Sequence, residues 1–213
     1  MRAGEAETGI PSLTPSSISS CPRNLLRLSG TDYTPRELTD KLNKNLDVLN
    51  LNGGGVTFSG GEPLLQKEFL LEIIGKCKAE GVNAAVETSL FIYDEAVFRS
   101  LDLVMADLKI WDNETHRQYT GVPSDVIKEN FSRLNRLGVP IIARTPVIPE
   151  IEQGIPEISE FLSGLKSVIK YELLPYHPLG ESKRVALGLE PSEFTVPTKE
   201  HMKELSQYVF IRK

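Results

Sequence analysis

Cysteine is scarce in this chain, which has only Cys21 and Cys77 among its 213 residues. Two distant thiols form neither a disulfide framework nor a complete zinc or iron-sulfur site. Long apolar runs are also missing, since the longest are a few residues, against the roughly 20 that a membrane-spanning helix needs. The sequence therefore excludes a disulfide-stabilised scaffold, a self-contained metal site and a helix that crosses a membrane.

Basic residues are not in excess either, because 24 lysines and arginines face 29 aspartates and glutamates, which leaves a net charge of −5. The charges of both signs are interspersed, so we expect no nucleic acid and no membrane surface as partner. Residues 1–7 lack the apolar stretch of a secretory signal, which predicts a cytoplasmic protein. A small molecule or another protein is the expected partner.

The composition, with 40% hydrophobic and 25% charged residues, is that of an ordinary globular domain. Residues 1–20 show no hydrophobic periodicity, and we assign them no structure. The first clear element is a helix that begins after Thr34, because Pro35 follows the cap and Glu37 completes a capping box.

Beyond that helix, short apolar runs typical of strands alternate with amphipathic segments typical of helices. This alternation predicts right-handed βαβ units, a parallel sheet and an α/β fold. In such sheets the reactive groups gather at the carboxyl ends of the strands. The predicted strands are 56–59, 82–88, 103–110, 140–148 and 168–174. Between and after them we predict one helix that ends at Gly81, a second that begins near Asp94, a third from about Ser124 to Gly138, a fourth that contains Ile158 and a fifth that begins near Thr198.

The first predicted strand ends in a glycine-rich turn. Gly60 and Gly61 let a ligand approach the backbone closely, and the carboxylate of Glu62 can accept hydrogen bonds from an ammonium group. The Gly-x-x-x-x-Gly-Lys pattern of a phosphate-binding loop is missing. Taken alone, this segment is a simple turn more often than a binding site.

Charged residues follow the other strand ends. Met105, Asp107 and Lys109 alternate along the third strand and so share one face, the fourth strand carries Arg144, and His177 follows the fifth. Each of these alone is more often an interior ion pair or an ordinary loop residue. Together they predict a pocket for a zwitterionic, polyhydroxyl ligand.

The motifs at these ends resemble those of the glycyl-radical-enzyme activating enzymes, radical S-adenosylmethionine proteins related to pyruvate formate-lyase activase. The resemblance runs from about Cys21 to Lys183 and implies a partial (β/α) barrel of the radical SAM type that lacks its first βα unit. The segments that carry it are 53–65, 87–89, 107–109, 119–122, 173–177 and 179–183.

The resemblance implies a role for each residue at the rim. The loop from Gly60 through Gly61 to Glu62 would hold the methionyl ammonium group, and Lys109 would face the methionyl carboxylate. Arg144 and His177 would contact the nucleoside half of S-adenosylmethionine.

Further residues resemble a monovalent-cation site beside that carboxylate, namely Thr88, Met105 and Asp107 with the backbone near Glu87. Glu87 stands where these activases usually have aspartate. Family chemistry uses a reduced [4Fe-4S] cluster, supplied with electrons by a flavodoxin or ferredoxin, to cleave S-adenosylmethionine. The resulting 5′-deoxyadenosyl radical takes a hydrogen atom from a glycine of a partner enzyme of the pyruvate formate-lyase superfamily.

The sequence departs from the family where the cluster should be held, because no Cys-x-x-x-Cys-x-x-Cys motif is present. Cys21 resembles the last ligand of an auxiliary cluster in a ferredoxin-like insert, although an inert thiol is the more frequent role for such a residue, and Cys77 is expected in the core. We therefore divide the chain into 1–33, a tail with the remnant of that insert, and 34–213, the partial barrel. Without the cluster ligands, this chain alone is expected to be inactive.

Two alternative functions remain open. The partial barrel can be a non-catalytic module that binds S-adenosylmethionine or docks a partner. It can also be an aldolase that forms a Schiff base on Lys109, which Asp107 disfavours because it keeps the ammonium group charged. The lack of the first βα unit is expected to leave the strand 56–59 as an exposed sheet edge, which predicts a homodimer or poor solubility.

Overall fold

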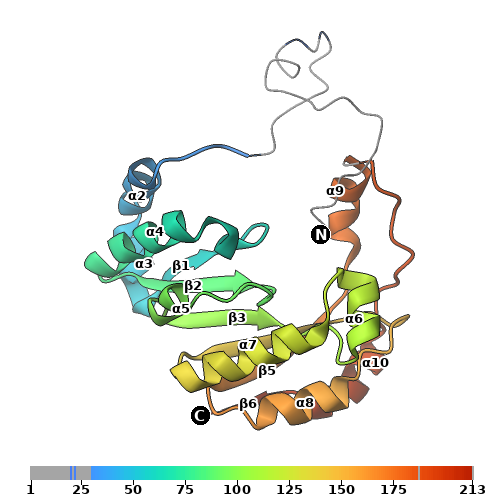
Figure 1. Ribbon diagram of the computed structural model, residues 1–213. Helices are drawn as coiled ribbons and strands as arrows, with labels where there is room; N and C mark the ends of the chain where they lie inside the picture. Colours follow the sequence, from blue (N-terminus) through green and yellow to red (C-terminus); the bar gives the residue numbers. More distant parts are fainter. Residues whose placement is uncertain (1–19, 21, 23–29, 187, 213) are drawn as a thin grey trace.

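The computed structural model describes residues 20, 22, 30–186 and 188–212. Its central feature is a six-stranded sheet in the order β1-β2-β3-β4-β5-β6, in which β1 to β5 run parallel and β6 is antiparallel to β5 (Figure 1). Among the described residues β1 pairs only with β2, so the sheet stays open, and the predicted partial barrel is confirmed. The strands are β1 (Gly55–Phe58), β2 (Asn83–Thr88), β3 (Leu103–Asp107), β4 (Ile141–Val147), β5 (Val168–Pro175) and β6 (Phe210–Ile211).

Helices connect the parallel strands, as the alternation in the sequence predicts. Two short helices, α6 and α9, were not predicted, and the single helix predicted after Thr34, expected to carry Leu38, Leu42 and Leu49, is divided into α2 and α3. The helices are α2 (Pro35–Asn43), α3 (Leu46–Asn50), α4 (Lys67–Ala79), α5 (Glu95–Arg99), α6 (Asn113–Thr120), α7 (Ser124–Leu137), α8 (Ile155–Ser163), α9 (Glu181–Ala186) and α10 (Lys199–Leu205), with 3-10 turns at η1 (Leu51–Gly53), η2 (Pro63–Gln66), η3 (Pro178–Gly180) and η4 (Ser206–Tyr208).

Local chemistry explains where these helices begin and end. The Thr34 side chain accepts from the Glu37 N–H at 3.3 Å while Glu37 Oε2 accepts from the Thr34 N–H at 2.8 Å, so the predicted capping box is confirmed. Helix α7 ends at Gly138, whose φ of +76° suits a residue without a Cβ.

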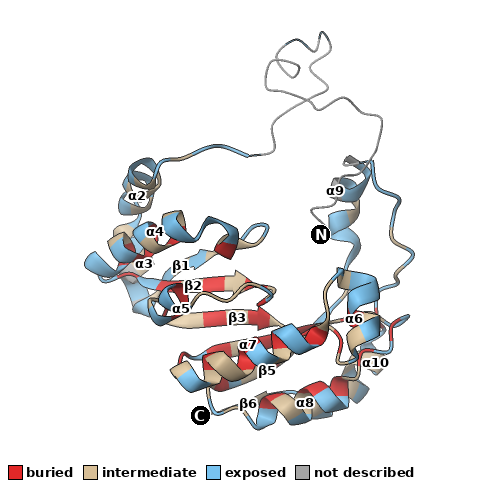
Figure 2. Ribbon diagram, viewed as in Figure 1, coloured by how far each residue is buried: buried red, intermediate tan, exposed pale blue. Residues whose placement is uncertain are grey.

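One face of the sheet is covered by helices and forms the core, where buried residues colour the inner sides of α7 and α8 and alternate along β2 and β3 (Figure 2). Val86, Val104 and Ala143 point into this core and are fully buried. Because strand side chains alternate, Glu87, Asp107 and Arg144 are on the other, half-exposed face. The fold thus separates an apolar face from a charged face.

The first strand joins a second, smaller core. Ile73, Cys77 and Val82 are buried there against Val56 and Phe58, which confirms Cys77 as a core residue. Cys21 and most of the predicted tail, residues 1–19 and 23–29, lie outside the described residues, and the division at residue 33 stays a prediction. No helix in the described part of the chain is long and apolar enough to cross a membrane.

Candidate functional site

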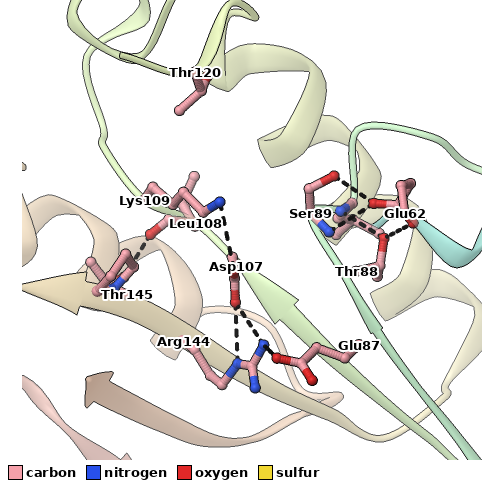
Figure 3. A network of polar contacts seen from close by, with 12 residues as sticks. Glu62, Glu87, Thr88, Ser89, Asp107, Leu108, Lys109, Thr120, Arg144 and Thr145 are labelled. Atoms are coloured by element: carbon pink, nitrogen blue, oxygen red, sulfur yellow. Dashed lines mark hydrogen bonds and ion pairs between the residues drawn. The ribbon is translucent and has the colours of Figure 1, made fainter. Parts of the chain in front are cut away.

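The glycine-rich loop after β1 is held against the end of β2 by Glu62. Glu62 Oε1 accepts from the Thr88 hydroxyl at 2.8 Å, and Oε2 accepts from the Ser89 N–H at 3.0 Å and the Ser89 hydroxyl at 2.6 Å (Figure 3). Gly60 has φ +129°, and a Cβ added there would meet nothing within 4 Å. The loop therefore has a fixed base and an open backbone at its tip.

The segment that follows β2 has a strained backbone at Leu90, next to the residues that hold Glu62. Leu90 is fully buried in the left-handed region at φ +57°, an unfavourable conformation for a leucine. Its N–H donates to the Thr88 hydroxyl at 3.0 Å, and its carbonyl accepts from Asn130 Nδ2 at 2.9 Å. Sequence reasoning did not identify Ser89 or Asn130 as supports. Ser89 belongs to the segment 87–89, but that pattern does not show that Ser89 binds Glu62, and Asn130 belongs to no motif.

Arg144 links two carboxylates across neighbouring strands. Its Nη2 donates to Glu87 Oε1 at 2.6 Å and to Asp107 Oδ1 at 3.0 Å, and its Nε donates to the same Asp107 oxygen at 3.1 Å (Figure 3). Burial alone lowers the pKa of Arg144, but Asp107 and Glu87 outweigh it and raise that pKa above its ordinary value. The guanidinium group therefore keeps its charge.

Lys109 extends beyond the end of β3 on the same face. Its Nζ lies 3.8 Å from Asp107 Oδ2, and 40% of its side chain is exposed. Since Arg144 already holds the other oxygen of Asp107, the Lys109 ammonium group is only loosely paired. It is a cation that can turn toward an incoming carboxylate.

A buried glutamine fixes the backbone under Lys109. Gln153 is 5% exposed, and its Nε2 donates to the Lys109 carbonyl at 2.8 Å and the Pro146 carbonyl at 2.6 Å, while its Oε1 accepts from the Ile148 N–H at 2.9 Å. It joins the ends of β3 and β4. Nothing in the loop sequence around Gln153 indicates this role.

A second chain of hydrogen bonds anchors the residue before Lys109. The Tyr171 hydroxyl donates to Thr145 Oγ1 at 3.0 Å, and Thr145 donates to the Leu108 carbonyl at 2.6 Å. Burial raises the pKa of Tyr171 to about 12, so its hydroxyl keeps the proton that this chain of bonds needs.

The remaining predicted site residues are placed as follows. Met105 shares the charged face of β3 and lies beside Glu87 in the register between β2 and β3. His177 is exposed just beyond the end of β5. The structure thus brings Glu87, Asp107, Lys109 and Arg144 into contact. The ligand-binding role of every predicted site residue, Met105 and His177 included, stays a prediction.

The described residues do not fit an iron-sulfur cluster. None of their histidines, cysteines, aspartates and glutamates form a group of three that could hold a metal ion. Cys77 is buried among apolar side chains, and burial raises the pKa of its thiol, which disfavours the thiolate that a cluster needs. The rim nevertheless combines a loosely paired ammonium group with an open glycine loop, an arrangement suited to a zwitterionic ligand.

Comparison with known proteins supplies the family context. Residues 21–162 match the radical SAM superfamily. The 4-hydroxyphenylacetate decarboxylase activating enzyme of Clostridioides difficile (strain CD196) is 37% identical over 91% of this chain and 64% of its own length, and the pyruvate formate-lyase-activating enzyme of Clostridium pasteurianum is 33% identical over 84% and 79%. The chain spans less than two thirds of the length of the first of these relatives.

Solved structures agree with the sequence comparisons. A domain of the pyruvate-formate lyase-activating enzyme from Bacteroides vulgatus ATCC 8482 superposes with a TM-score of 0.60 at 33% identity, over 73% of this chain and 92% of that domain. Streptococcus suis SuiB bound to S-adenosylmethionine shares the fold, with a TM-score of 0.64 at 16% identity over 85% of this chain and 41% of SuiB.

Proposed function

Since this chain belongs to the radical SAM superfamily, and within it to the activating enzymes of glycyl-radical enzymes, we propose that it binds S-adenosylmethionine at the carboxyl edge of its sheet. The observation that carries this proposal is the placement of Lys109, which leaves an exposed ammonium group beside a carboxylate that Arg144 already neutralises. The positive charge of the Lys109 ammonium group suits the negatively charged carboxylate of the methionyl group.

The chain's own residues have distinct tasks in this proposal. Lys109 binds the methionyl carboxylate, and the open backbone at Gly60 and Gly61 receives the ammonium group. Glu62 holds that loop against β2 through Thr88 and Ser89, and its direct contact with the ligand stays a prediction. His177 would approach the nucleoside half from the end of β5.

The radical step needs a [4Fe-4S] cluster, which supplies the electron that cleaves the sulfonium of S-adenosylmethionine. Because the described residues do not fit that cluster, we assign no step of the cleavage to them. This chain by itself is expected to bind the cofactor and leave it intact. In a complete activating enzyme the same rim would orient the cofactor for transfer of a hydrogen atom from a glycyl-radical-enzyme partner, with a flavodoxin or ferredoxin as electron donor.

Calorimetric titration with S-adenosylmethionine tests the binding. Lys109→Met should weaken it by about 10- to 100-fold, since a hydrogen bond to a charged group contributes about 1.5–3 kcal/mol. Lys166→Met removes another exposed lysine, beyond the end of α8, and should leave binding unchanged.

Two results would count against this reasoning. Equal affinity of the Lys109→Met variant and the unaltered protein would remove Lys109 from the site. We also expect weak binding by the metal-free chain, because the cluster would supply a large share of the contacts with S-adenosylmethionine. A dissociation constant below about 1 μM for the metal-free chain would contradict that expectation.

Within the described part of the chain, β1 pairs with β2 alone, and we propose that its other edge pairs with a second copy of the chain. Beside that edge lies a groove of about 320 Å³ between α2, β1 and α4, lined by apolar side chains such as Leu42, Phe58 and Phe69. Antiparallel pairing of β1 with a second copy can place Val56 opposite Phe58 of that copy on the same face. Light scattering after size-exclusion chromatography tests this proposal, and a monomer at all concentrations would contradict it.

A further inference from the structure

The acidic pair on the charged face has a counter-ion that belongs to the chain. Glu87 lies on β2 and Asp107 at the end of β3, and the guanidinium group of Arg144 contacts both at 2.6 and 3.0 Å. The Arg144 and Asp107 side chains are 12% and 22% exposed, so water screens their contact little, whereas Glu87 is 39% exposed and its contact with Arg144 is screened more. We propose that Arg144 takes the place of a monovalent cation at this pair, so that the protein binds neither Na⁺ nor K⁺ there.

The positions of the oxygen atoms that could bind a cation support this proposal. An alkali cation needs several oxygen ligands that converge on one point. The Thr88 hydroxyl instead donates to Glu62 and accepts from Leu90, and Thr88 is buried on the opposite face of β2 from Glu87. Asp107 Oδ1 accepts two hydrogen bonds from Arg144. As they are placed, these residues do not fit a bound ion.

The charge balance points the same way. Glu87 and Asp107 contribute two negative charges, and Arg144 and Lys109 contribute two positive charges, so the four groups together are neutral. An additional cation would meet the guanidinium group at the position where both carboxylates are already bonded. Its electrostatic repulsion from Arg144 would oppose binding.

The length of Glu87 makes the contact with Arg144 feasible. The register pairs Asp107 with Arg144 directly across β3 and β4, whereas Glu87 is one strand further away and pairs with Met105. An aspartate at position 87 would be shorter by one methylene group and would not reach Nη2 in this arrangement. Glutamate at position 87 therefore favours the Arg144 guanidinium group over a Na⁺ or K⁺ ion as the counter-ion.

Thermal unfolding in different salts tests the inference without any S-adenosylmethionine, so its outcome is independent of the proposed function. The protein is unfolded in KCl, NaCl and tetramethylammonium chloride at one ionic strength. The unaltered chain should unfold at the same temperature in all three. Arg144→Gln leaves the carboxylates without their counter-ion, and its midpoint should rise by several degrees in KCl or NaCl relative to tetramethylammonium chloride.

Two further variants complete the test. Arg144→Lys keeps a positive charge and should remain insensitive to the choice of cation. Glu87→Asp keeps the negative charge but frees the carboxylate at position 87 from Arg144, which stays bonded to Asp107. It should gain the dependence on K⁺ or Na⁺ even if Arg144→Gln does not fold. A stabilisation specific to K⁺ or Na⁺ in the unaltered chain would overturn the inference. So would the absence of any cation-specific response in Glu87→Asp and in a folded Arg144→Gln variant.

Discussion

Replacing Gln153 by leucine tests how far the candidate site depends on one buried side chain. Leucine is shorter by one atom and has no polar atoms, so the Lys109 and Pro146 carbonyls and the Ile148 N–H lose their partner. A buried polar group without a hydrogen bond costs about 1–3 kcal/mol, so the three groups together should lower the free energy of unfolding by at least about 3 kcal/mol. That is a large fraction of the roughly 5–15 kcal/mol that stabilises a typical domain.

Urea unfolding followed by circular dichroism measures this loss, and a thermal scan should show a midpoint lower by about 6–12 °C for a chain of this size. Gln118→Leu, at an exposed position in α6, is the matched control and should change stability little. A loss below about 1 kcal/mol for Gln153→Leu would refute the reasoning, because a single unmet hydrogen bond already costs that much.

Gln153→Glu adds a dependence on pH with a defined sign. The new carboxylate can accept from the Ile148 N–H but can donate to neither carbonyl while it is ionised, and once protonated it can donate to one of them. Its pKa should therefore be higher in the folded state than in the unfolded state, so the variant should gain stability as the pH falls. A variant that loses stability in acid as the unaltered protein does would contradict this expectation.

Three further predictions follow from buried groups. Burial lowers the pKa of His116, so the unfolded state takes up a proton at a higher pH than the folded state does. The free energy of unfolding should therefore fall as the pH drops below about 6.5, and it should fall less in His116→Gln. Urea unfolding at several pH values measures this difference. Tyr171, with its pKa raised to about 12, should cost stability as the pH rises above about 10, and Tyr171→Phe should show a smaller alkaline loss in the same assay. Phe131→Ala should lower the free energy of unfolding by about 3–5 kcal/mol because this side chain is fully buried, whereas Val126→Ala, at a residue 38% exposed, should cost much less.

The candidate site was predictable where it depends on the position of residues along strands. Alternation within 103–109 places Asp107 and Lys109 on one face, and the order of strands and helices places the end of β3 beside that of β4. The contact between Arg144 and Glu87 was not predictable in this way. It spans 57 positions of the chain and two strand intervals, and it depends on side-chain length and rotamer.

The parallel α/β order, the capped helix after Thr34 and the edge of the sheet where polar residues gather could all be read from the sequence, because they follow from hydrophobic periodicity and turn chemistry within a few neighbouring residues. Folding in three dimensions was needed to reveal that Gln153 supports the backbone at Lys109, that Leu90 is held in a strained conformation by Asn130, and that β6 pairs with β5. Those features join segments far apart in the chain, and hydrogen-bond geometry across such distances leaves no periodic pattern in the sequence.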